Sequence, residues 1–345
     1  MQRGSSPRPI IKYITTSDDG VNWIKIGDMP HFGRIVTSTE EKITKEGAKK
    51  SRLVKKGDLI LSNSMSYGLP YIMGIDGYIH DGWFVLKDFE NTFDKDYLCN
   101  LLISSAIQNQ YKRLAAGGVV QNISSDLVNS VSVSIPTMTE QKKISSLLNL
   151  IDERIATQNK IIDKLQSLIR GIAQNVVRNN KPNVRLSDCM ECSSSTLQES
   201  DVCEHGKYPV YGANGIVGYL DNYNTEGEAV YIIKDGSGVG TVSYVTGKCS
   251  ATGTLNTLQA KEGYSLQHLY YLLKVFNFEP YKTGMAIPHI YFKDYGKAKV
   301  FCPPYTEQLR YARLLSAIDN KLLVEKNILT SLSLQKQYLL RQMFI

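Results

Sequence analysis

Residues 135–177 read IPTMTEQKKISSLLNLIDERIATQNKIIDKLQSLIRGIAQNVV, and residues 302–344 repeat the pattern as CPPYTEQLRYARLLSAIDNKLLVEKNILTSLSLQKQYLLRQMF. The two segments align without a gap, because Pro136 matches Pro303, 167 residues later, and each copy opens with Pro-x-x-Thr-Glu-Gln. A repeat spaced at about half of a 345-residue chain predicts two equivalent halves, each ending in one copy of this segment.

Each copy predicts one long α-helix, because its seam residues recur in alternating steps of four and three. In the first copy these are Ile144, Leu148, Ile151, Ile155, Gln158, Ile162, Leu165, Ile169, Ile172 and Val176. In the second they are Tyr311, Leu315, Ile318, Leu322, Glu325, Leu329, Leu332, Lys336, Leu339 and Met343. This spacing is typical of a coiled coil, so we expect the two copies to pair as antiparallel spacer helices, each ~55 Å long. The alternative is an ordinary helical hairpin within a core.

The motif at the start of each copy also predicts a helix cap. We expect the hydroxyls of Thr139 and Thr306 to accept the first backbone N–H bonds. Glu140 and Glu307 follow directly, where the helix dipole favours an anion.

Composition restricts the partners and the compartment. The net charge is +7 and the isoelectric point is near 8.9, so a polyanion is a plausible partner if the charge is clustered. We find no apolar run of about 18 residues and no signal-peptide core, and we therefore expect a cytoplasmic protein.

Six cysteines are expected to be free thiols. Cys189, Cys192, Cys203 and His205 offer a zinc-ligand set as an alternative, but the Cys-x-His spacing is cramped and the first half has no equivalent. We expect neither a metal nor a cofactor.

The first half contains a basic run between two expected strands, which begin near Trp23 and Leu59. A helix is expected over residues 96–114, and a last strand over residues 131–134. Clustered lysines neutralise phosphates without reading sequence, whereas small polar and amide side chains on loops suit base edges. The alternative is a solvated loop. The predicted DNA-binding residues of this half are Lys49, Lys50, Arg52, Ser64, Tyr67, Gln121 and Asn122.

The second half follows the same plan with different loop side chains. It has a turn-rich entry at residues 207–215, a strand at residues 228–233 and a helix at residues 266–276. His289 could equally be a core histidine, and Tyr211 a packing residue. The predicted DNA-binding residues are Tyr211, Asn214, Lys234, Ser237, Lys248, His289 and Lys293.

Two motifs resemble catalytic loops, and we interpret both as structural. The glycine-rich residues 236–240 precede a strand-like segment rather than the helix that a phosphate-binding loop needs, so a β-turn is expected. Cys302-Pro303-Pro304-Tyr305 is similar to the Asn/Asp-Pro-Pro-aromatic loop of amino-methyltransferases, but Cys302 lacks the oxygen that would bind the target amine. We predict no catalytic residue.

Several segments together resemble the specificity (S) subunit of type I restriction-modification systems. The most specific is the duplicated Pro-x-x-Thr-Glu-Gln with its long helix. The others are Trp23-Ile24-Lys25-Ile26-Gly27-Asp28, Lys56-Gly57-Asp58 and Tyr208-Pro209-Val210-Tyr211-Gly212. The resemblance covers essentially the whole chain. One departure is that Asn183 to Cys189 looks like the family's lead segment, whereas residues 1–5 do not, so the first domain is expected to lack an edge strand.

The resemblance implies an α+β protein with a pseudo-two-fold internal repeat. Its expected parts are a target-recognition domain (residues 1–135), a central spacer helix (136–180), a second target-recognition domain (181–302) and a C-terminal spacer helix (303–345). The resemblance further implies that the two domains read the halves of a bipartite, asymmetric site in double-stranded DNA. Two methyltransferase (M) subunits would supply S-adenosylmethionine and adenine-N6 methylation, and restriction (R) subunits would translocate and cleave DNA.

The spacer residues that we expect at the helix–helix interface are Ile144, Leu148, Ile151, Ile155, Leu315, Ile318, Leu322 and Leu329.

Two other classes of function stay open. A stand-alone DNA-modifying enzyme would act without partners, and a coiled-coil adaptor would join proteins without binding DNA.

Overall fold

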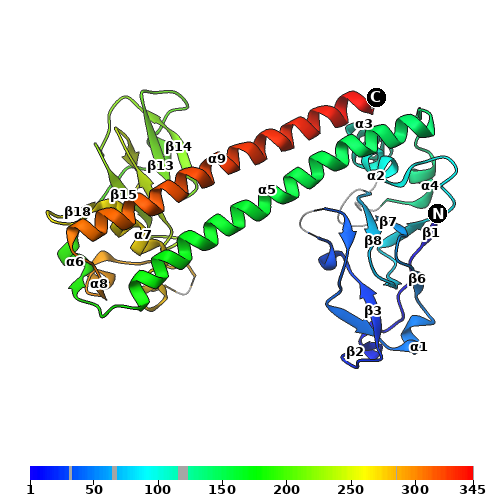
Figure 1. The fold of residues 1–345 in the computed structure, drawn as a ribbon, viewed down its shortest axis with the longest axis horizontal. Coiled ribbons are helices and arrows are strands. Elements are labelled where there is room, and N and C mark those ends of the chain that lie inside the picture. The colour runs from blue at the N-terminus through cyan, green and yellow to red at the C-terminus, as the bar shows by residue number, and fades with distance from the viewer. Residues whose placement is uncertain (31–32, 64–67, 116–122, 285, 345) are drawn as a thin grey trace. The chain divides into compact units, whose positions relative to one another are not determined.

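The computed structural model of the chain describes residues 1–30, 33–63, 68–115, 123–284 and 286–344 (Figure 1). The chain divides into two compact units. The first unit is Met1–Lys160 with Asn327–Ile345, and the second unit is Ile161–Lys326. Two long helices, α5 (Met138–Arg178) and α9 (Tyr305–Met343), contribute to both units. The expected domain boundaries at residues 135, 180 and 302 stay a prediction.

In its described residues, the first unit contains two five-stranded sheets. One has the strand order β1-β10-β7-β8-β4 and the other the order β2-β5-β3-β9-β6. Their strands are β1 (Gln2–Arg3), β2 (Ile14–Thr15), β3 (Val21–Ile24), β4 (Ile35–Val36), β5 (Glu41–Ile43), β6 (Arg52–Val54), β7 (Leu59–Ser62), β8 (Pro70–Met73), β9 (Gly77–Ile79) and β10 (Trp83–Leu86). The buried strand expected near Leu59 is confirmed as β7, whose four residues are all buried. The expected lack of an edge strand is wrong in part, because β1 pairs antiparallel with β10.

The first unit also contains short helices. They are α1 (Lys45–Ala48), α2 (Lys95–Ile103), α3 (Ser105–Ala115) and α4 (Ser125–Asn129). The helix expected over residues 96–114 is broken, because Ser104 has extended backbone angles and separates α2 from α3. The strand expected over residues 131–134 is wrong: this segment has no ladder partner among the residues that the structure describes. Val131 nevertheless packs on the apolar cluster that contains Leu59 and Leu148.

The described part of the second unit has three sheets. Their orders are β12-β18-β15-β16, β14-β13-β17 and β11-β19. The strands are β11 (Val184–Arg185), β12 (Met190–Ser194), β13 (Tyr208–Gly212), β14 (Gly215–Leu220), β15 (Ala229–Ile233), β16 (Val242–Val245), β17 (Ser250–Ala251), β18 (Leu255–Ala260) and β19 (Lys299–Val300). The helices are α6 (Leu186–Cys189), α7 (Leu266–Val275) and α8 (Phe292–Tyr295).

Two loop predictions in the second unit had different outcomes. The turn-rich entry at residues 207–215 is in fact the β13–β14 hairpin, because Tyr208 to Gly212 alternate well enough to pair with β14. The glycine-rich turn at residues 236–240 is confirmed, since it leads into strand β16 and not into a helix. Gly240 has a φ of +89°, and a Cβ there would lie 2.9 Å from the ring of Phe278, so this turn needs glycine.

The seam of each long helix is its buried side. Each of the ten positions on α5 and each of the ten on α9 is buried or half-buried, including Gln158 and Glu325. Glu325 pairs with Lys321 one turn earlier. A helix that is packed along its whole length needs a continuous stripe of buried positions on one side, and both long helices have one.

The predicted caps at Thr139 and Thr306 are wrong. Thr137 caps α5 instead: its hydroxyl accepts the backbone N–H of Glu140 at 3.4 Å, and the Glu140 carboxylate accepts the backbone N–H of Thr137 at 3.0 Å. This reciprocal pair is a capping box. At α9 the carbonyl of Pro304 accepts the N–H groups of Glu307 and Gln308. Both helices therefore begin earlier than the threonines, which lie inside the first turn.

Among the described residues, no helix is both long enough and apolar enough to cross a membrane.

Candidate nucleic-acid interface

The predicted basic residues of the first unit lie together on exposed structure. Helix α1 is capped by Thr44, whose hydroxyl accepts the N–H of Gly47 at 3.2 Å. It ends just before Lys49 and Lys50, which are both exposed. Arg52 is the first residue of strand β6, and the Nε of Arg52 donates to the carbonyl of Arg3 at 3.3 Å. Three exposed cationic side chains therefore lie within four consecutive residues.

Lys50 is the most firmly positioned of these cations. Its ammonium bonds the hydroxyl of Tyr13 and lies 4.7 Å from the centre of that ring. The hydrogen bond to Tyr13 raises the pKa of Lys50, so this side chain stays charged. Gly47 makes the contact possible, because a Cβ there would lie 2.8 Å from the Cβ of Tyr13.

Four predicted residues, Ser64, Tyr67, Gln121 and Asn122, lie outside the described residues. The residues that flank them are informative. The backbone N–H of Ile123 donates to the carbonyl of Asn63 at 2.8 Å, and the Asn63 amide donates to the carbonyl of Asp81 at 2.8 Å. Asn63 is buried. The described residues that border these positions, Asn63 and Ile123, are therefore hydrogen-bonded to each other.

The second unit gathers three predicted residues into one loop pair. The backbone N–H of Gly236 donates to Pro288, and that of Ile290 donates to Lys234. These bonds place Lys234, Ser237 and His289 on adjacent segments. The imidazole of His289 forms a 2.7 Å hydrogen bond with the Asp235 carboxylate. His289 is half-buried beside a charged partner, and it is therefore not a core histidine.

The remaining predicted residues of the second unit lie elsewhere. Tyr211 is half-buried in β13 with its ring 5.7 Å from that of Tyr231, which is a packing role. Asn214 is exposed between β13 and β14. The Lys248 ammonium lies 3.5 Å from the Glu226 carboxylate, and Lys293 lies 5.2 Å from the centre of the Tyr291 ring.

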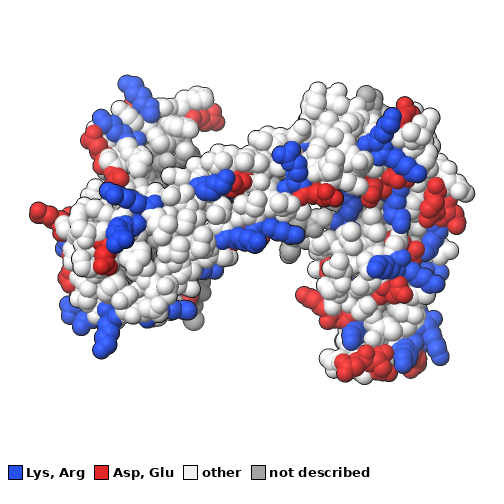
Figure 2. Space-filling model, in the orientation of Figure 1, with Lys and Arg blue, Asp and Glu red and all other residues white. Residues whose placement is uncertain are grey.

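Sequence reasoning missed the partners that fix these side chains. Tyr13 lies 37 residues from Lys50, and Asp235 lies 54 residues from His289. No periodicity or spacing in the sequence indicates such pairs, because they form when separate segments pack together. On the face that Figure 2 shows, Lys and Arg are interspersed with Asp and Glu over both units, so charge sign alone does not outline an interface.

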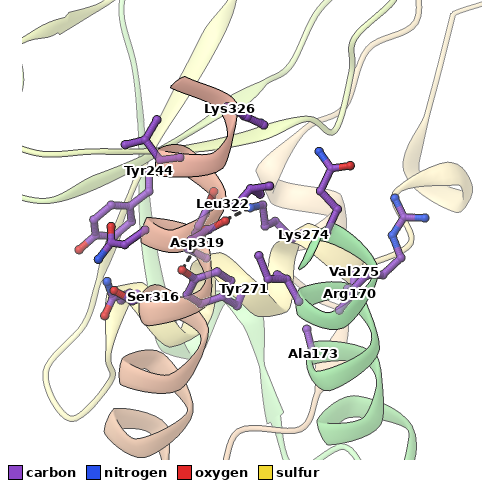
Figure 3. A pocket seen from close by; sticks show the side chains of 16 residues that line it. Arg170, Ala173, Tyr244, Tyr271, Lys274, Val275, Ser316, Asp319, Leu322 and Lys326 are labelled. Atoms are coloured by element: carbon purple, nitrogen blue, oxygen red, sulfur yellow. Dashed lines mark hydrogen bonds and ion pairs between the residues drawn. The ribbon is translucent and has the colours of Figure 1, made fainter. Parts of the chain in front are cut away.

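A pocket of about 760 Å³ lies in the second unit, where α5 and α9 meet α7. Tyr271 and Lys274 of α7 point toward Asp319 of α9 (Figure 3). The Tyr271 hydroxyl donates to the Asp319 carboxylate at 2.9 Å, and the Lys274 ammonium lies 3.4 Å from it. Burial, together with this carboxylate, raises the pKa of Tyr271.

The first unit has an equivalent arrangement around Asp152, which matches Asp319 in the repeat. The Asp152 carboxylate accepts from the guanidinium of Arg34 at 3.2 Å and also pairs with Lys336. The pocket beside it is smaller, about 220 Å³. In both units an aspartate of the long helix binds side chains that include one from the globular part.

Cys189 and Cys302 are buried free thiols that interact with each other, and a hydrogen bond with Cys302 lowers the pKa of Cys189. Cys302 is 6% exposed, and its backbone N–H is held by the Asn183 side chain at 2.9 Å, so a substrate amine would not reach it. In the part of the chain that the structure describes, no group of three or more His, Cys, Asp or Glu side chains could hold a metal ion.

Comparison with known families gives two matches on this chain. The family model described as "Type I restriction modification DNA specificity domain" matches residues 7–167 and again residues 180–334. Each match takes in one globular part together with most of the long helix that follows it.

Individual relatives point to the same family. The specificity subunit of the Escherichia coli type I restriction enzyme EcoprrI is 21% identical over 343 residues, which covers 92% of this chain and 85% of that protein. A type I specificity subunit of Mycoplasma genitalium is 25% identical over 261 residues, covering 69% of this chain and 68% of the relative.

The fold is also shared with solved structures. The crystal structure of a type I restriction-modification S subunit from M. genitalium superposes with a TM-score of 0.63 at 17% identity, covering 99% of this chain and 96% of that one. A second structure, from a study of type I restriction-modification complex assembly and conformational transition, gives a TM-score of 0.56 at 16% identity and covers 99% of this chain and 93% of that one.

Proposed function

Because this chain belongs to the type I restriction-modification DNA specificity family, we propose that it is the subunit that selects the DNA sequence for such a complex. The observation that carries the proposal is that the family model matches twice, over residues 7–167 and 180–334. Two recognition units in one chain favour a bipartite site, and the different loop side chains of the two units favour an asymmetric one.

In the proposed complex each unit reads one half-site in double-stranded DNA. Lys49, Lys50 and Arg52 of the first unit would neutralise phosphates, and the segments next to Asn63 and Ile123 would meet base edges. In the second unit the loop pair that holds Lys234, Ser237 and His289 would have the recognition role. The imidazole can donate or accept at a base edge, and its bond to Asp235 fixes the ring orientation.

The chemistry would belong to partner subunits. We propose two methyltransferase subunits, one for each equivalent half of this chain, which carry S-adenosylmethionine and methylate adenine at N6, and restriction subunits that translocate and cleave. This chain would contribute no cofactor and no catalytic residue, and it would act in the cytoplasm, where the DNA is.

We further propose that α5 and α9 act together as an antiparallel coiled-coil spacer that fixes the gap between the half-sites. Burial within each unit supports this. In the first unit, Leu148 near the start of α5 lies in the same apolar cluster as Leu339 and Met343 near the end of α9. In the second unit, Ala173 near the end of α5 lines one small pocket with Tyr311 and Leu315 near the start of α9.

Methylome sequencing of cells that express the chain with its methyltransferase subunits tests the proposal. The expected result is one bipartite motif with a fixed gap, which disappears when this chain is deleted. Methylation by the purified chain alone would instead support a stand-alone enzyme. A chain that shows no DNA affinity at any salt concentration, alone or in the complex, would support an adaptor.

The spacer is tested by inserting four residues after Gln158 and four after Glu325, so that both helices lengthen by ~6 Å, or about two base-pair steps. The half-site sequences should stay the same while the gap widens by a comparable amount. The control is a four-residue insertion between the exposed Glu262 and Gly263, which should leave the gap unchanged. An unaltered gap in the lengthened variant contradicts the spacer role.

A further inference from the structure

The glutamine that closes each Pro-x-x-Thr-Glu-Gln motif is buried. Gln141 is 1% exposed and Gln308 is 2% exposed, whereas the preceding residues Glu140 and Glu307 are exposed. A buried amide needs partners for both its oxygen and its nitrogen. The motif therefore has a role inside the fold that a helix cap does not explain.

The two glutamines make the same bonds in the two units. The side-chain oxygen of Gln141 accepts the backbone N–H of Asp94 at 2.8 Å, and that of Gln308 accepts the backbone N–H of Ser265 at 2.8 Å. Each side-chain nitrogen donates to the carbonyl of its own motif proline, at 3.1 Å to Pro136 and 2.9 Å to Pro303. Gln141 also donates to the carbonyl of Thr92 at 3.0 Å.

The residues that the glutamines hold are helix caps. Asp94 is the N-cap of α2, and Ser265 is the N-cap of α7. In a capping box, a Glu or Gln three residues into the same helix accepts the N–H of the cap. Helices α2 and α7 have Tyr97 and His268 at that position, and a glutamine from the long helix takes over the bond.

This arrangement fixes the rotation of each long helix about its own axis. Neighbouring residues on a helix point about 100° apart, so a small rotation moves the glutamine away from its partners. In the first unit two more bonds on the same face restrain α5: Ser145 donates to Asp94 at 2.6 Å, and Asn149 donates to Asp96 at 2.9 Å. In α9 the residue that matches Ser145 is the buried Ala312.

We propose that Gln141 and Gln308 are positioning residues that set the angle at which each recognition unit is held on its spacer helix, and that they thereby restrict the DNA gap the complex accepts. The inference rests on the proposed function. Without the amide, the unit could tilt or rotate on the helix at a lower cost, because the cap N–H no longer has a fixed partner. Sites with a neighbouring gap then become acceptable.

The experiment compares methylomes of cells that carry the methyltransferase subunits with the wild-type chain, Gln141→Met, Gln308→Met or both. Methionine keeps the length and loses the hydrogen bonds. In each single variant, methylation at motifs whose gap is one base pair shorter or longer should rise about tenfold relative to the native gap, with unchanged half-site sequences. The double variant should show a larger rise. Gln335→Met, at an exposed glutamine of α9, is the matched control and should show none.

Ser145→Ala keeps the test decisive if a methionine variant fails to fold. This change introduces the residue that α9 already has at the equivalent position. It removes the hydroxyl that bonds the Asp94 carboxylate and the Gln141 carbonyl but keeps the glutamine, so a smaller rise is expected. Methylation that falls at all sites while the gap distribution stays that of the wild type would overturn the inference, because the glutamines would then matter for stability alone. Absence of any bipartite motif with the wild-type chain would instead overturn the proposed function.

Discussion

The hydroxyl of Tyr271 donates a 2.9 Å hydrogen bond to the carboxylate of Asp319, which joins helix α7 of the second unit to the long helix α9. Asp319 is partly shielded, and its second partner, Lys274, lies 3.4 Å away. The matching aspartate of the repeat, Asp152, uses an arginine and a lysine instead. The two copies of the repeat therefore share an aspartate acceptor on the long helix but differ in the side chains that donate to it.

Tyr271→Phe should destabilise the second unit by about 1–2 kcal/mol, because the charged acceptor loses a shielded donor. Hydrogen exchange of the α7 amides, followed by mass spectrometry, measures the effect. The two tryptophans, Trp23 and Trp83, both lie in the first unit, so their fluorescence provides the control and its unfolding midpoint should not move. If Asp319→Ala abolishes the effect of Tyr271→Phe in a double-mutant cycle, the bond is its cause. Additive effects would contradict this explanation.

Stability should fall in mild acid because of His268. Burial lowers the pKa of His268 to about 4, and within the described part of the chain neither ring nitrogen has a hydrogen-bond partner. The unfolded chain takes up a proton below about pH 6.5, whereas the folded chain resists it down to about pH 4. The contribution of this histidine to folding is therefore full above pH 6.5 and declines between those values, by about 3 kcal/mol in all.

His268→Phe should remove that part of the pH dependence, since phenylalanine fills the apolar site without a titrating group. Urea unfolding followed by circular dichroism at pH 7.0, 6.0 and 5.0 makes the comparison. Burial also lowers the pKa of His80 in the first unit, so His80→Phe separates the two contributions. An unchanged slope in His268→Phe would show that the destabilisation has another source.

Lys50→Ala should weaken DNA binding uniformly across sequences, because the ammonium held over Tyr13 is proposed to contact a phosphate. The slope of log K against log salt should become shallower by about 0.9, the value for one phosphate contact. Titrations of the assembled methyltransferase complex at several salt concentrations measure the slope. Lys87→Ala is the control, because Lys87 pairs with Asp58 at 2.5 Å. Equal slopes for Lys50→Ala and the wild type would show that Lys50 does not contact a phosphate.

Asp235→Ala should alter recognition at one half-site alone. The imidazole of His289 loses the 2.7 Å bond that orients it, so the base preference in the half-site read by the second unit should relax while the other half-site stays intact. Methylome motifs resolve the two halves separately. Glu262→Ala serves for comparison, because Glu262 is exposed and lies outside the loop pair. Relaxation in both half-sites would show that the loop pair does not read one half on its own.

The sequence indicated the long helices and their covered side because both depend on local spacing. Alternating steps of four and three place the seam residues on one side of a helix, independently of the rest of the chain. All twenty seam positions are buried or half-buried in the structure. The duplicated motif and the family resemblance could likewise be read from short stretches of sequence. The cap of α5 was misplaced by two residues, because Thr137 and Thr139 are both good cap residues and only the structure shows which hydroxyl accepts the backbone N–H of Glu140.

What the motif glutamines do was decided by tertiary structure. Gln141 meets Asp94 across 47 residues of sequence, and Gln308 meets Ser265 across 43. The sequence alone fixed two helices with buried stripes, since helical periodicity is a property of neighbouring residues. Only packing decided which buried amide bonds which cap and which aspartate orients which histidine, because a hydrogen bond between distant segments forms once both have been brought to the same place.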